Sequence, residues 1–174
     1  MTAARVLLLA FAVAGLPPDA IRVTPLVRDG ELLVSFSAPG AVTDELREAI
    51  RTGMVVTFTY DVSLRQGAFL WFDRTLADAE VAANVRFDNL TRTYHVTRMV
   101  DGRVFWSQSS AREDEVRGWL TEFDRLKLFA AGSLQPNAEY AIDIRARISP
   151  RRAWTLWPFG RHDATGRAPF TYIR

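Results

Sequence analysis

Hydrophobic and polar residues alternate along several stretches of the chain, most clearly over Met54–Arg65. Every second residue of Val56–Leu64 is apolar, and the residues between them are polar. This period of two predicts a β-strand with one face in the core and one in water. The pattern recurs over Ala79–Asn89 and Glu139–Ser149. Strands with one wet face indicate an antiparallel sheet, because parallel sheets are usually covered on both faces.

Two Asp-Gly pairs stand between alternating runs. Asp29-Gly30 separates the first two runs of the chain, and Asp101-Gly102 separates residues 94–100 from residues 103–109. Both positions of a tight hairpin turn need a positive φ, which Asp and Gly tolerate well. Each pair therefore predicts a β-hairpin.

Two amphipathic helices interrupt the strands. The first follows Thr43, a good N-cap, and ends at Gly53, a good C-cap. The second begins at Ser110 with Glu113 three residues on, which reads as a capping box. The apolar residues at helical spacing are Leu46, Ala49 and Ile50 in the first helix and Val116, Trp119, Leu120 and Phe123 in the second.

These elements predict an α+β fold that is mainly antiparallel β. We expect one domain over residues 21–174, built as a bent sheet or a β-sandwich-like domain with two short helices. Residues 150–169 show no period and are interpreted as an irregular segment, and Phe170–Ile173 as a short closing strand.

The N-terminus has the pattern of a secretory signal peptide. Arg5 precedes an apolar run of about a dozen residues, which is short of the roughly 20 that a membrane-spanning helix needs. Small residues offer cleavage after Ala14 or Ala20. We therefore expect residues 1–20 to be a signal peptide and the protein to be periplasmic or extracellular, with an uncleaved anchor or a buried helix as the alternative.

The amino-acid composition limits the bonds, metal sites and binding partners that the protein can have. The absence of cysteine excludes disulfides and thiolate metal sites. The formal net charge of +2 is too small to indicate a polyanionic partner, and no nucleic acid is expected to bind. The charge is uneven, because residues 145–174 carry seven arginines and one acid.

No catalytic, cofactor or metal motif emerges from the sequence. His95 and His162 are far apart in the chain, and His95 is expected on the wet face of a strand. Three strand acids, Asp61, Asp88 and Asp143, are interpreted as solvated rather than as a glycosidase pair. We therefore expect a protein that is not an enzyme and holds no cofactor or metal.

Two aromatic groups remain as candidate contact sites. One combines arginines with aromatic residues and fits an acidic partner, a nucleic acid strand or peripheral contact with an anionic membrane, or else folds onto the core. Its members are Arg151, Arg152, Trp154, Trp157, Phe159 and Arg161. The other group either lines a ligand pocket or forms a buried strand, and its members are Phe69, Trp71 and Phe72, with Trp106 as a further pocket candidate.

Several packing motifs resemble a bacterial family catalogued as domain of unknown function 4390. The resemblance covers most of residues 21–149 and lies in the helix, glycine and strand of Leu46–Tyr60, the Trp71-Phe72-Asp73 turn, the Phe87–Tyr94 segment, and an amphipathic helix with Leu120 and Leu126. It implies an exported envelope protein of unknown activity, and it carries over no functional residues.

The sequence is compatible with three functions. The first is a non-enzymatic envelope protein that binds another protein, since sheet edges can accept a partner strand. The second is a carrier or sensor of an apolar or lipidic ligand. The third, a hydrolase of envelope polymers, rests only on scattered acids and hydroxyls. The partner is thus an unknown envelope protein or a lipid.

Overall fold

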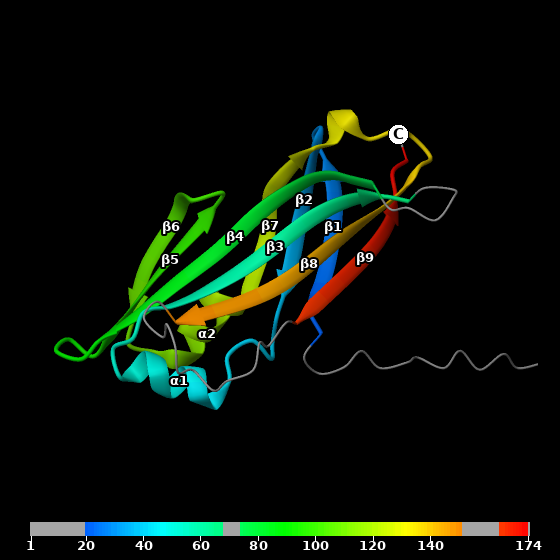
Figure 1. The fold of residues 1–174 in the computed structure, drawn as a ribbon. Helices are drawn as coiled ribbons and strands as arrows, with labels where there is room; N and C mark the ends of the chain where they lie inside the picture. The colour runs from blue at the N-terminus through cyan, green and yellow to red at the C-terminus, as the bar shows by residue number, and fades with distance from the viewer. Residues whose placement is uncertain (1–19, 68–73, 151–163, 174) are drawn as a thin grey trace, which may run out of the picture.

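The computed structural model describes residues 20–67, 74–150 and 164–173 (Figure 1). The elements in these ranges are, in chain order, β1 (Arg22–Arg28), β2 (Glu31–Ser37), α1 (Asp44–Arg51), β3 (Val56–Gln66), β4 (Arg74–Asp88), β5 (Thr93–Val100), β6 (Arg103–Ser110), α2 (Glu113–Thr121), β7 (Glu122–Ala130), the 3₁₀ turn η1 (Ala131–Ser133), β8 (Glu139–Pro150) and β9 (Thr165–Thr171).

The described strands form two antiparallel sheets. The larger sheet has the order β6-β5-β4-β3-β8-β9, and the smaller has the order β1-β2-β7. Figure 1 shows the smaller sheet crossing behind β3, β4 and β8, with both helices at one end. The predicted fold class, an antiparallel α+β protein of sandwich-like form, is confirmed.

The alternation that predicts β3 produces the core. Its apolar residues Val56, Phe58, Tyr60, Val62 and Leu64 are each at most 1% exposed. β3 pairs with β4 on one side and with β8 on the other, so the three clearest alternating segments are neighbours at the centre of the sheet. β4 begins at Arg74 and so extends further toward the N-terminus than the alternation predicts.

An aromatic cluster joins the two sheets. The rings of Phe36 and Phe123 stack with centroids 4.7 Å apart, and the Tyr60 ring lies 5.0 Å and 5.4 Å from them. The Tyr60 hydroxyl donates a 2.8 Å hydrogen bond to the carbonyl of Leu120 in α2. Burial raises the pKa of the Tyr60 hydroxyl, so it stays protonated and keeps this bond.

Both predicted hairpins and the first helix are confirmed. Asp29-Gly30 and Asp101-Gly102 all have positive φ, as two-residue hairpin loops require. The Thr43 hydroxyl accepts from a backbone N–H of the first turn of α1, and Gly53 follows that helix with a φ of 86°.

The second helix differs from its prediction at both ends. Ser110 still pairs with Tyr94 in the sheet, so α2 begins after Arg112, and the capping box is wrong. The Ser110 hydroxyl instead accepts from the Arg112 N–H and donates to Glu115. Phe123 is also not helical, because the chain turns extended at Glu122 and pairs with β2.

β7 is therefore an element that the sequence analysis missed. Leu126, which the family resemblance places on a helix, pairs with Val34 in the smaller sheet. Arg125 has a φ of 46°, and the register shifts close to it. This irregularity breaks the period of two that would otherwise reveal the strand.

The closing strand is longer than expected and begins inside the predicted irregular segment. Residues 165–169 pair with β8, which corrects that part of the prediction, while residues 151–163 lie outside the described residues. The Ile21 N–H donates to the carbonyl of Thr165, and a Cβ on Gly166 would clash with the Ile21 carbonyl oxygen. The missing side chain at Gly166 thus lets β9 meet the start of β1, and we call this contact the β1–β9 seam.

Candidate functional site

Most contact residues predicted from the sequence lie outside the described residues. These are Phe69, Trp71 and Phe72 in one group and Arg151, Arg152, Trp154, Trp157, Phe159 and Arg161 in the other, and both proposals stay predictions. Trp106 is described. Its ring lies edge-on to Trp119 with centroids 5.0 Å apart, beneath the guanidinium of Arg98.

The predicted solvent-facing acids and His95 do not converge on one site. His95 is exposed, and its Nδ1 lies 2.7 Å from the Ser109 hydroxyl. Asp88 caps the turn after β4, where backbone N–H groups of Leu90 and Thr91 hydrogen-bond to its carboxylate and lower its pKa. In the part of the chain that the structure describes, no three His, Asp or Glu side chains are grouped to hold a metal ion.

The interior is filled by side chains. An apolar crevice between the two helices, lined by Val42, Ile50, Val116 and Leu120 among others, has a volume of about 20 Å³. That volume is comparable to the space for one water molecule and far below that of a lipid chain. The two sheets meet across closely packed residues such as Leu32, Tyr60 and Leu120, each at most 1% exposed.

Within the described residues, four strands form the edges of the two sheets, and three of them carry features that block pairing with another chain. β1 contains Pro25 and an arginine at each end, β7 contains four charged residues, and β9 contains Pro169. Prolines and charges at sheet edges are the usual means by which proteins prevent edge-to-edge association. β6 has no proline, and its single charge is Arg103 at its first position.

β6 also exposes two apolar side chains. Val104 is 60% exposed and Phe105 is 48% exposed, and both lie in the first half of the strand. Within the described residues β6 pairs with β5 alone, so alternate backbone N–H and C=O groups on its outer side point to solvent. Phe105 has no partner in β5, because the register shifts between Val104 and Trp106, and it is therefore the extra residue of a β-bulge.

The hairpin of β5 and β6 is anchored by Arg98. The Arg98 Nε donates to the Trp119 carbonyl at 2.7 Å, and one terminal nitrogen donates to the carbonyls of Gly118 and Glu122 at 3.2 Å and 2.7 Å. The guanidinium carbon lies 4.4 Å from the Phe123 ring centroid. Partial burial lowers the pKa of Arg98, which still leaves it charged at neutral pH. The edge is therefore held in place by the end of α2.

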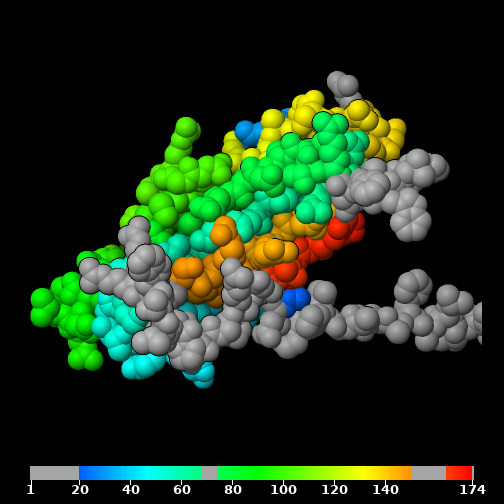
Figure 2. All heavy atoms as spheres, viewed as in Figure 1, coloured from blue at the N-terminus to red at the C-terminus, as the bar shows by residue number. Residues whose placement is uncertain are grey.

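A second candidate lies on the outer side of β3, β8 and β9. It is a groove of about 1020 Å³, and its polar residues Asp61, Ser63, Arg65, Asp143, Arg145 and Arg167 are called the charged face below. In Figure 2 the bands of β4, β3, β8 and β9, coloured from green to red, form one continuous surface.

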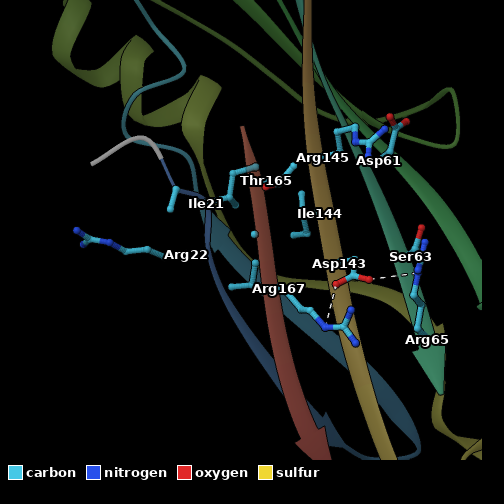
Figure 3. A pocket seen from close by; sticks show the side chains of 13 residues that line it. Ile21, Arg22, Asp61, Ser63, Arg65, Asp143, Ile144, Arg145, Thr165 and Arg167 are labelled. Carbon is cyan, nitrogen blue, oxygen red and sulfur yellow. Dashed lines mark ion pairs between the residues drawn. The ribbon is translucent and has the colours of Figure 1, made fainter. Parts of the chain in front are cut away.

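Asp143 is the centre of the charged face. Figure 3 shows Arg65 from β3 and Arg167 from β9 approaching it from opposite sides, with Nε to carboxylate distances of 3.2 Å and 3.6 Å. Arg145 lies two residues further along β8, opposite Asp61 and Thr165. Arg22, which also lines the groove, points away from Asp143 in Figure 3.

The sequence alone predicts only part of either candidate site, the edge of β6 or the charged face. An edge strand cannot be recognised before the strand order is known, and the charged face joins residues of three strands through their register. The alternation did show that Asp61 and Asp143 lie on wet faces, and this is confirmed.

Residues 20–67, 74–150 and 164–173 form an antiparallel sandwich-like fold, in which β6 is the edge strand without proline or multiple charges and β3, β8 and β9 carry the charged face. Residues 19–152 match a family model described as Domain of unknown function (DUF4390), and the chain belongs to this family. The sequence resemblance is thereby confirmed. No curated protein and no solved structure matches the chain. None of the described helices has the length and apolar character needed to span a bilayer.

Proposed function

We propose that the protein is an exported, non-enzymatic module that binds another protein by adding an extended segment of that partner to β6. The observation that carries the proposal is the contrast between β6 and the other edges. β6 combines unpaired backbone groups with exposed Val104 and Phe105, and it lacks the prolines and multiple charges of β1, β7 and β9.

The exposed groups of β6 indicate which residues the added partner segment should contain. Backbone hydrogen bonds along β6 would supply affinity, and alternate side chains would supply specificity. The exposed Val104 and Phe105 favour apolar or β-branched residues in the added strand. The side chain of Arg103, which makes no ion pair or hydrogen bond within the described residues, favours an acidic residue near one end of the added strand.

The remaining features support a binding module over the alternatives. Among the described residues, the core between the sheets is closely packed and the apolar crevice between the helices is too small for a lipid chain, which weighs against a carrier. Asp61 and Asp143 are engaged by arginines, which weighs against a hydrolase that needs two free carboxylates. Export is proposed from the apolar N-terminal run.

Site-specific photo-cross-linking in the native host tests the proposal. A photoreactive phenylalanine at position 105 should form one discrete adduct, whose cross-linked peptide maps to an extended apolar segment of a single protein. The same probe at Leu90 is the matched control, because Leu90 is 95% exposed but lies on a turn. That segment, made as a peptide, should bind the wild type and bind the Val104→Lys variant at least about tenfold more weakly.

The proposal fails if position 105 yields no more adduct than position 90. It also fails if Val104→Lys, with an unchanged melting temperature, binds the mapped peptide as the wild type does. Val104 is exposed, so we expect the lysine variant to fold normally.

A further inference from the structure

We infer that the charged face around Asp143 is a binding site for a phosphate group. Three guanidinium groups share this face with two carboxylates: Arg65 and Arg167 flank Asp143, and Arg145 lies opposite Asp61. The other acid of the face, Asp61, is occupied by a bidentate contact with Arg147, whose Nε lies 2.6 Å from its Oδ2. As defined above, the charged face holds three arginines and two acids, so it carries one net positive charge.

The hydrogen-bond donors are also in excess. Each guanidinium has five N–H donors, whereas one carboxylate offers about four acceptor positions. The side chain of Arg145 makes no ion pair or hydrogen bond within the described residues. The buried Nε of Arg65 lies 3.2 Å from Asp143 without the alignment of a hydrogen bond. A ligand with several acceptor oxygens would satisfy donors that the protein itself leaves open.

Phosphate fits this arrangement better than a single carboxylate. It is an anion at neutral pH, which suits the net positive charge of the face, and its tetrahedral oxygens accept the planar fork of arginine in pairs. The groove is open and holds about 1020 Å³, so it admits a phosphate ester as well as the free ion. Glu139, the next acid along this side of β8, does not line the groove.

This site is independent of the edge of β6. The order β6-β5-β4-β3-β8-β9 places the two at opposite sides of the larger sheet, with β4 and β5 between β6 and the nearest strand of the charged face. Arg65, Arg145 and Arg167 lie outside β6, and the proposed partner segment contacts none of the strands that carry them. One inference can therefore fail while the other stands.

Titration of the full folded domain with inorganic phosphate tests the site. Amide and arginine Nε–H resonances would be followed by NMR at constant ionic strength, with chloride replaced by phosphate. We expect saturable shifts at Arg65, Arg145 and Arg167. Because the Arg145 side chain makes no ion pair or hydrogen bond within the described residues, Arg145→Gln should fold normally and weaken binding about tenfold or more. Arg86→Gln, which removes an exposed arginine of β4, is the matched control and should bind as the wild type does.

Shifts that do not saturate, or equal binding by the wild type and Arg145→Gln, would overturn the inference. The source of the phosphate is distinguished with vesicles that contain phosphatidylglycerol. Vesicle binding that inorganic phosphate displaces supports the site and assigns a lipid headgroup. Binding of inorganic phosphate without binding of vesicles supports the site and assigns a small phosphate or its ester.

Discussion

Replacing Arg98 by methionine should destabilise the fold more than any other arginine replacement in the two hairpins described above. Methionine keeps a flexible apolar stem of similar reach but removes the guanidinium. The change therefore deletes three hydrogen bonds to backbone carbonyls around the end of α2 and two ring contacts, with Phe123 and Trp106.

The magnitude follows from those contacts. Hydrogen bonds to a charged group contribute about 1.5–3 kcal/mol each, and a cation–π contact about 0.5–2 kcal/mol. The contributions are not additive, and the Glu122 carbonyl lies near solvent, where water replaces the lost donor. We therefore expect a loss of about 3 kcal/mol in the free energy of unfolding, which is a large part of the roughly 5–15 kcal/mol typical of a domain.

Urea denaturation measures the effect, with the slope m checked for constancy. Arg98→Lys keeps the charge but loses the planar fork, so its loss should be intermediate, about 1–2 kcal/mol. Arg86→Met is the control and should change the free energy of unfolding by less than about 0.5 kcal/mol. A loss below about 1 kcal/mol for Arg98→Met, or wild-type stability for Arg98→Lys, would refute the anchoring role of Arg98.

Three further predictions concern stability. Gly166→Ala should cost about 1–3 kcal/mol in urea denaturation because its Cβ would meet the backbone of Ile21, whereas Gly132→Ala, with no atom within 4 Å, should be neutral or slightly stabilising. Tyr60→Phe leaves a carbonyl of α2 without its buried donor and should lower stability by about 1–2 kcal/mol, and an unchanged urea midpoint would contradict this. Asp88 has a lowered pKa when folded, so its stabilising contribution is complete above the unfolded pKa of about 3.9 and is lost as the pH falls through the folded pKa. Asp88→Asn keeps the turn, so between pH 6 and pH 3 its urea midpoint should vary less with pH than that of the wild type.

Much of the fold could be predicted because the sequence patterns that specify its strands, turns and first helix each lie within a short segment. The alternation in β3, β4 and β8, the Asp-Gly turns and the cap at Thr43 each lie within a dozen residues. β7 could not be predicted in the same way. Its first residues continue the helical spacing of α2, and the choice between helix and strand at Phe123 is made by stacking on Phe36, a residue 87 positions earlier.

The candidate sites depend on still longer-range information. Arg65 and Arg167 meet at Asp143 only because β3 and β9 flank β8 in one particular register. The sequence shows that β6 is poor in charges, but it does not show that β6 lies at an edge. Strand order and register are tertiary properties, and no pattern within a single segment contains them.

The β1–β9 seam has a consequence for how a newly made chain reaches its native state. Ile21 and Thr165, which join at the seam, are 144 positions apart, so β1 can meet β9 only after the residues between them have been synthesised. Until then the edges of β1 and β8 stay open to other chains. Closure of the seam in a nascent polypeptide therefore depends on residues that are synthesised late.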